Sequence, residues 1–287
     1  MKIRIGTRKS KLAIVQTNMV IQALKASFPD VEVEIVHIIT QGDVIMDKPL
    51  TQFGGKGLFI TEFEKALTQG EIDMAVHSAK DLPVELAEGL EIAGVLPRGN
   101  YRDVLVTRKE KPIINRSDFV VGTSSMRRSQ GIKKLYPMVS LKDIRGNVDT
   151  RLGKLLSGQY DAIVLAAAGL ERLGLYCSED YDVTPFECRE LMPAPCQGIV
   201  AMECLKDGLT AEYIKKINHN ETYLSFLAER SVPQLLMADC GTPVGAYSYV
   251  ENGWIHMFVS TENDKIMEGK MPAYQGRELA RKLVSRL

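Results

Sequence analysis

The segments VVGTSSMRRSQ (residues 120–130) and LKDIRGNVDTRL (residues 141–152) decide how this chain is expected to fold. Each is typical of a strand, a glycine-containing turn and a helix, the repeating unit of α/β folds. Arginines lie at or just after both turns: Arg127, Arg128, Arg145 and Arg151. Because helix N-termini offer unpaired backbone N–H groups and partial positive charge, both turns are predicted anion sites.

The same alternation of strands and helices extends outward from these segments. Strands are predicted at residues 2–7, 32–39, 73–76, 91–96, 103–107, 119–122, 140–144 and 162–165. Helices are predicted after Ser10 and at residues 58–68, 126–135 and 148–156. The pattern indicates a mostly parallel sheet that occurs twice, with ligands at the carboxyl ends of the strands and a cleft between the two units.

The C-terminal part of the chain has a different pattern. Helices are predicted at residues 211–217, 221–232 and 276–287, and a hairpin at 243–250 and 254–260 around Glu251-Asn252-Gly253. A unit this small cannot bury a large core, so we expect it to dock on the remainder of the chain.

Composition excludes several classes of protein. Lys plus Arg equals Asp plus Glu, at 36 each, which argues against general binding to nucleic acid or to membrane surfaces. No apolar run approaches the ~20 residues of a membrane span. The N-terminal residues lack the apolar centre of a signal peptide, so a cytoplasmic location is expected. The five cysteines are odd in number and the four histidines are scattered, which favours neither disulfides nor a metal site.

Three further segments carry candidate chemistry. Lys80-Asp81 follows a short strand and Ser78, where it forms either a polar turn or an acid or base in a cleft. Cys240 lies in a turn containing Gly241 and Pro243 and is either buried filler or an accessible nucleophile. Gly54-Gly55-Lys56-Gly57 fails the phosphate-loop pattern, because Gly57 follows the lysine, and a lid over the ligand is the better interpretation.

Nine ordered segments together closely resemble the porphobilinogen deaminase (hydroxymethylbilane synthase) family, over nearly the whole chain. They are IGTRKSKLA, TQGDVIMD, GGKGLF, DMAVHSAKDLP, VVGTSSMRR, IRGNVDTRL, DAIVLAAAGLERLG, CQG and CGTPVG. The resemblance implies two α/β domains like those of periplasmic binding proteins and a small α+β C-terminal domain. The chain is expected to cross between the two α/β domains twice. The implied boundaries are residues 1–96 plus 197–216, 97–196, and 217–287.

The resemblance also implies a function. The family is a transferase of tetrapyrrole (porphyrin and heme) biosynthesis that condenses four porphobilinogen molecules head to tail on a dipyrromethane cofactor. Ammonia is released at each step, and hydrolysis releases hydroxymethylbilane. Each pyrrole carries an acetate and a propionate, so arginine clusters in a chain of zero net charge are consistent with this substrate. A monomer without metal is expected.

By position, the resemblance assigns roles to individual residues. Cys240 is the expected covalent attachment point of the cofactor, and Asp81 the expected catalytic carboxylate. Expected cofactor-binding residues are Ser78, Lys80, Thr123, Ser125, Arg127, Arg128 and Arg145. Expected substrate-binding residues are Arg8, Ser10, Lys56, Arg145, Arg151, Arg172 and Gln197. Two other classes of protein remain as alternatives, because two α/β lobes with a carboxylate-binding cleft also occur in them: solute-binding proteins and the ligand-sensing parts of transcription regulators.

Overall fold

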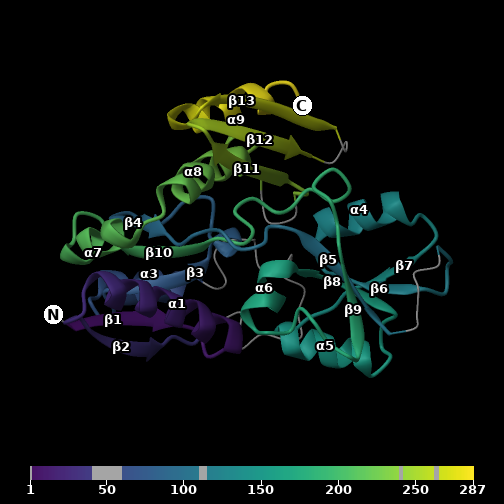
Figure 1. Ribbon diagram of the computed structural model, residues 1–287, viewed down its shortest axis with the longest axis horizontal. Coiled ribbons are helices and arrows are strands. Elements are labelled where there is room, and N and C mark those ends of the chain that lie inside the picture. Colours follow the sequence, from purple (N-terminus) through teal and green to yellow (C-terminus); the bar gives the residue numbers. More distant parts are fainter. Residues whose placement is uncertain (1, 41–59, 110–114, 239–241, 262–264) are drawn as a thin grey trace.

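The structure is a computed structural model that describes residues 2–40, 60–109, 115–238, 242–261 and 265–287. Three sheets organise these residues, and Figure 1 shows them as two lobes side by side with a smaller unit above both. The α/β class with a small α+β unit is therefore confirmed. Within the described residues, no helix has the length and apolar character that crossing a membrane requires.

The N-terminal lobe is built on a five-stranded sheet. Its strands, in sheet order, are β2 (Glu32–His37), β1 (Lys2–Thr7), β3 (Met74–Ser78), β10 (Val200–Leu205) and β4 (Leu90–Val95). Helices α1 (Lys11–Ser27) and α7 (Leu209–Ile217) pack on one face through residues such as Leu24 and Ile214. Helix α3 (Thr61–Thr68) buries Phe63 and Leu67 on another apolar cluster of the lobe.

The second lobe repeats this arrangement. Its sheet order is β7 (Ser140–Lys142), β6 (Val120–Gly122), β8 (Ala162–Ala166), β5 (Asp103–Arg108) and β9 (Tyr181–Pro185). Helices α5 (Val148–Leu156) and α6 (Ala167–Arg172) share one apolar cluster, and α4 (Met126–Leu135) packs into a separate one through Ile132. Helices α4 and α5 have the bounds that the sequence pattern predicts.

The C-terminal unit consists of an antiparallel sheet and two helices. Strands β11 (Gly245–Glu251), β12 (Trp254–Ser260) and β13 (Ile266–Pro272) pack against α8 (Asn220–Leu235) and α9 (Gly276–Val284). A buried ion pair docks this unit on the chain that leaves the N-terminal lobe, since Arg98 Nη1 lies 2.6 Å from Glu229 Oε1 of α8.

The prediction of mostly parallel sheets is wrong. Strand β10 runs antiparallel to β3 and β4, and β5 runs antiparallel to β8 and β9. The reason is topological: β10 re-enters the first sheet after the chain returns from the second lobe, whereas β1, β2 and β3 follow one another within the N-terminal lobe. The local pattern also missed β9, β10, β13 and the short helix α6.

The two passages of the chain between the lobes lie side by side. Leu96 donates its backbone N–H to Val200 at 3.0 Å, and Gly99 donates to Gly198 at 3.0 Å. Gly198 has a φ of +88°, and a Cβ on it would lie 2.7 Å from the Gly99 carbonyl oxygen. Only glycine meets both conditions, so the close approach of the two crossings depends on it. The domain boundaries given above stay a prediction.

Candidate functional site

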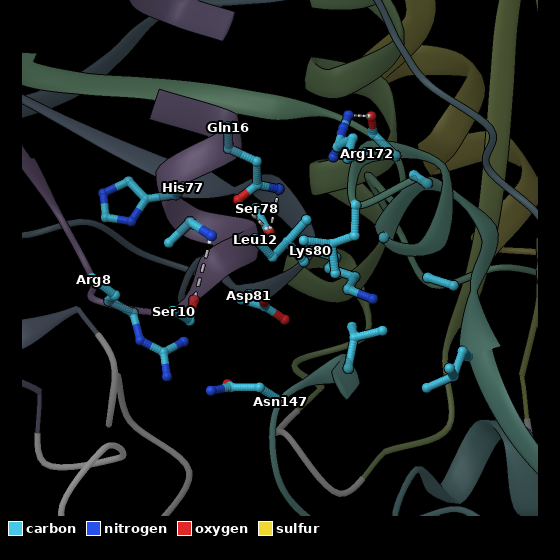
Figure 2. A pocket seen from close by; sticks show the side chains of 18 of the residues that line it. Arg8, Ser10, Leu12, Gln16, His77, Ser78, Lys80, Asp81, Asn147 and Arg172 are labelled. Atoms are coloured by element: carbon cyan, nitrogen blue, oxygen red, sulfur yellow. Dashed lines mark hydrogen bonds between the residues drawn. The ribbon is translucent and has the colours of Figure 1, made fainter. Parts of the chain in front are cut away.

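A cleft lies between the lobes, where several strands of both sheets end. Strands β1 and β3 lead into it from the N-terminal lobe, and β8 together with the start of α5 leads into it from the second. Eight of the residues singled out from the sequence line this cleft: Arg8, Ser10, Ser78, Lys80, Asp81, Arg128, Arg151 and Arg172. Residues from both halves of the chain therefore meet in one cavity (Figure 2).

Hydroxyl groups on the N-terminal side are held by local hydrogen bonds. Ser10 is the N-cap of α1, and its Oγ accepts the Ala13 N–H at 3.3 Å. Gln16, one turn further along α1, donates its Nε2–H to Ser78 Oγ at 2.8 Å. Figure 2 shows Gln16 and Ser78 joined in this way beside Lys80. Helix α1 thus fixes the end of β3, and Lys80 and Asp81 line the cleft just beyond this end.

Lys80 and Asp81 occupy a single turn of 3₁₀ helix, Ala79–Asp81, directly after β3. The Ala79 N–H donates to the Ile199 carbonyl at 3.0 Å, which ties the turn to the second crossing. Both side chains are exposed to the cleft rather than packed away. Lys80 Nζ donates to Gln197 Oε1 at 3.4 Å. The protein surrounding the amine lowers the pKa of Lys80 to about 8, against the opposing charge of Asp81.

The second lobe contributes guanidinium groups. Arg151, in the first turn of α5, donates its Nε–H to the Gly146 carbonyl at 2.7 Å. Burial, with the nearby charge of Arg128, lowers the pKa of Arg151 to about 10. Arg172, at the end of α6, donates to the Gly198 carbonyl at 2.6 Å, and burial lowers its pKa as well. A lowered arginine pKa indicates a cation that an anionic ligand would stabilise.

Five predicted site residues do not line the cleft in the described structure: Thr123, Ser125, Arg127, Arg145 and Gln197. Thr123 Oγ1 accepts the Ser125 N–H at 3.2 Å, and Ser125 is the N-cap of α4, so both shape the turn that carries the arginines. Arg127 and Gln197 lie in a buried network described below. Lys56 and Cys240 fall outside the described residues.

The sequence pattern missed several polar residues of this region. Gln16 and Asn147 line the cleft, and Asp103 is fully buried behind it. A signal existed for Gln16, because a buried polar residue interrupts the apolar face of α1. A weaker signal existed for Asp103, which opens a strand of otherwise apolar residues.

The arrangement suits a ligand that carries several carboxylates. Cations from both lobes, Lys80, Arg128, Arg151 and Arg172 among them, surround a space that also receives the Asp81 carboxylate. Guanidinium groups bind carboxylates through paired hydrogen bonds. Among the described residues, no cluster of His, Cys, Asp and Glu has the arrangement of a metal site. The cleft therefore offers carboxylate binding together with the acidic group of Asp81, and a second carboxylate, Asp149, lies on the opposite wall, 3.3 Å from Lys11 Nζ.

The family model and the relatives that match this chain all belong to the same family. The family model described as "Porphobilinogen deaminase, dipyromethane cofactor binding domain" matches residues 3–212. A porphobilinogen deaminase of Geobacillus sp. (strain WCH70) is 41% identical over 286 residues, which cover 99% of this chain and 88% of the relative. One of Rickettsia bellii (strain OSU 85-389) is 44% identical over 254 residues, which cover 88% and 84%.

Likenesses among solved structures are weaker. The periplasmic aliphatic sulphonate binding protein SsuA from Escherichia coli is 14% identical, with a TM-score of 0.45, over 82% of this chain and 70% of that one. A likeness at this level supports no conclusion about function.

Proposed function

The chain belongs to the porphobilinogen deaminase family, and we propose that its cleft condenses four porphobilinogen molecules in sequence on a dipyrromethane primer. Ammonia leaves at each addition, and water finally releases hydroxymethylbilane. The observation that carries this proposal is the position of Asp81, which lies in a cleft whose other wall presents Arg128, Arg151 and Arg172.

The first task of these residues is to bind carboxylates. Arg128 and Arg151 of the second lobe hold acetate and propionate groups, and Lys80 adds a cation from the opposite wall. Ser10 and Ser78 donate hydroxyl hydrogen bonds, while Arg8 and Arg172 mark the two sides of the substrate space (Figure 2). Such contacts orient a pyrrole ring without taking part in bond making, which lowers the entropic cost of the reaction.

The second task belongs to Asp81. When ammonia leaves porphobilinogen, positive charge develops and spreads onto the pyrrole nitrogen. A carboxylate fixed in the cleft stabilises this charge and accepts a hydrogen bond from the pyrrole N–H. Because the turn Ala79–Asp81 is anchored to Ile199, the carboxylate is held in place before the substrate binds.

The residues of the cleft fit the dipyrromethane cofactor. Two linked pyrroles carry four carboxylates. Lys80 and Arg128 line the cleft, and two further cations, Arg127 and Arg145, lie next to Arg128 and to the Gly146 turn in the sequence. Thr123 and Ser125 shape the turn before α4. When bound, the cofactor supplies the pyrrole carbon to which substrate is added. Cys240 would hold it through a thioether.

One measurement tests this proposal directly. Intact-protein mass spectrometry of the purified protein should show the sequence mass plus two linked pyrrole units, and Cys240→Ser protein should lack the excess. The cysteine at position 177, which is exposed, gives a matched control, because Cys177→Ser should keep the excess. A wild-type protein that turns over porphobilinogen without any added mass would contradict the proposal. Reversible carboxylate binding without turnover would favour a solute-binding protein instead.

The same proposal includes a cytoplasmic, monomeric enzyme without nucleic-acid partners. Light scattering of the holoenzyme should give a mass close to the 31.9 kDa of one chain. A stable dimer at micromolar concentration would contradict the monomer.

A further inference from the structure

A buried carboxylate, Asp103, stands behind the arginines of the cleft. It opens strand β5 of the second lobe and is 0% exposed. Its Oδ1 accepts three hydrogen bonds, from Arg128 Nε at 3.1 Å, Arg128 Nη2 at 2.7 Å and Gln197 Nε2 at 3.0 Å. One oxygen of Asp103 therefore joins the start of α4 to the second crossing of the chain.

Both arginines of the pair share this carboxylate. Arg127 Nη1 lies 2.7 Å from Asp103 Oδ2 and forms an ion pair with it. Among the described residues, Asp103 Oδ2 has no partner with hydrogen-bond geometry. The same nitrogen of Arg127 donates to the Met192 carbonyl. Burial opposes ionisation of Asp103, but the charges of Arg127 and Arg128 outweigh burial and hold the pKa of the carboxyl well below its usual range. Asp103 is accordingly an anion while it faces them.

Two acceptors, Asp103 and Val164, set the orientation of Arg128. Asp103 accepts from its Nε and Nη2, and the Val164 carbonyl accepts from its Nη1 at 3.0 Å. Arg128 nevertheless lines the cleft, so a guanidinium with three N–H groups bonded to the protein still faces the space for a ligand. A guanidinium has five N–H donors, and these three contacts leave capacity for a carboxylate.

The network also reaches the N-terminal lobe. Gln197 donates to Asp103 through Nε2 and accepts from Lys80 through Oε1. The amide thus has a fixed orientation, because Asp103 can only accept and Lys80 can only donate. Asp103, Gln197 and Lys80 form a continuous path from the second lobe to the turn that carries Asp81.

Two adjacent guanidinium groups repel each other, and burial removes part of their hydration. Without a counterion nothing would offset these two costs. With Asp103 between them, the group of three keeps one net positive charge and an ordered geometry. A site that is ordered in advance loses less entropy when a ligand binds. We propose that Asp103 is the positioning residue for Arg127 and Arg128, which orders the pair for cofactor and substrate carboxylates before either has bound.

This inference rests on the proposed function for the identity of the ligand. Its test compares Asp103→Asn with Asp161→Asn, a matched control. Asp161 pairs with Arg108 in the same lobe and does not line the cleft in the described structure. Folded Asp103→Asn protein should contain at least fivefold less dipyrromethane by intact mass and show a raised KM for porphobilinogen. Asp161→Asn should match wild type in both. Folded Asp103→Asn protein with wild-type loading and KM would overturn the proposal.

Asp103→Ala supplies a readout that a purely structural role would not move. Formate fits the space of the missing carboxyl, so millimolar formate should lower the KM of this variant toward wild type with little effect on kcat. In wild-type protein, formate should raise KM, because it competes for the same arginines. A KM of the variant that formate leaves unchanged or raises would count against a positioning role.

A last measurement needs no Asp103 variant. In Cys240→Ser protein, which should lack cofactor, the Arg128 Nε–H should give a nitrogen-15 NMR signal with slow solvent exchange, assigned by its loss in Arg128→Lys. Fast exchange would show that the pair is not ordered in advance and would overturn the proposal. Wild-type protein without dipyrromethane mass would contradict the proposed function instead, and the NMR result would still decide about Asp103.

Discussion

The two lobes share an architecture but differ in what they bring to the cleft. The N-terminal lobe contributes the hydroxyls of Ser10 and Ser78 and the adjacent Lys80 and Asp81, while the second lobe contributes Arg128, Arg151 and Arg172. The difference indicates a division of labour: one wall carries the reactive carboxylate, and the other wall binds carboxylates of the ligand. Changes on the two walls should therefore affect different kinetic constants.

The largest effect is expected at Asp81. Asp81→Asn removes the charge that stabilises the developing cation, so kcat should fall by about a thousandfold while the dipyrromethane mass stays. Steady-state ammonia release on holoenzyme measures this. Asp149→Asn, which changes a carboxylate on the opposite wall of the same cleft, should lose less than about tenfold. Equal losses in the two variants would remove the distinction between the walls.

Arg151 should act mainly on binding. Arg151→Leu removes a guanidinium bonded to Gly146 at the entry of α5, so the KM for porphobilinogen should rise by about tenfold to a hundredfold, with a smaller change in kcat. Arg281→Leu is the control, because Arg281 forms an exposed ion pair with Glu278 in α9. A fall in kcat at unchanged KM would mean that Arg151 acts on the reaction step, as Asp81 does, rather than on binding.

Lys80 should give the cleft a dependence on pH. Because its pKa is lowered to about 8, the amine loses its charge as pH rises through 8, and carboxylate binding weakens there. The value of kcat/KM should fall above about pH 8 in wild type, since this ratio reports the free enzyme. Lys80→Arg keeps its charge and should lack the fall. A profile that is identical in both proteins would rule out Lys80 as the titrating group.

The smallest effect is expected where the walls touch. Lys11 Nζ of the N-terminal lobe lies 3.3 Å from Asp149 Oδ2 of the second, and both side chains are exposed. Such a pair contributes at most about 1 kcal/mol, so Lys11→Glu should change kcat by less than about fivefold. The double exchange Lys11→Glu with Asp149→Lys should restore it. Double-variant kinetics that show no coupling would mean that the contact between Lys11 and Asp149 does not influence turnover.

How far the sequence predicts this molecule depends on the range of the interactions involved. The bounds of α4 and α5 follow from local pattern, because Ser125 and the turn at Gly146-Asn147 set where each helix begins. Lys80-Asp81 and the arginines of the second lobe could also be named from turns at strand ends. These features are encoded within a few residues, and the structure brings them to one cleft.

Features made by distant segments could not be predicted. The buried residue Asp103 meets Arg128 across 25 positions and Gln197 across 94, and no local spacing indicates either contact. The sequence pattern did not predict β10, and the return of the chain through Gly198 places this strand antiparallel to β3. The assignment of carboxylates rather than phosphates to the arginines depended on the family resemblance and on the failure of Gly54-Gly55-Lys56-Gly57 to match the phosphate-loop pattern.

The central claim is that the two walls act on a substrate added to the chain's own cofactor. Rapid mixing of holoenzyme with about one equivalent of porphobilinogen, followed by intact-mass spectrometry, tests it most directly. Wild-type protein should give species heavier than the starting holoenzyme by whole porphobilinogen units less ammonia, and Asp81→Asn protein should remain at the starting mass. Release of ammonia while the protein mass never changes would contradict it.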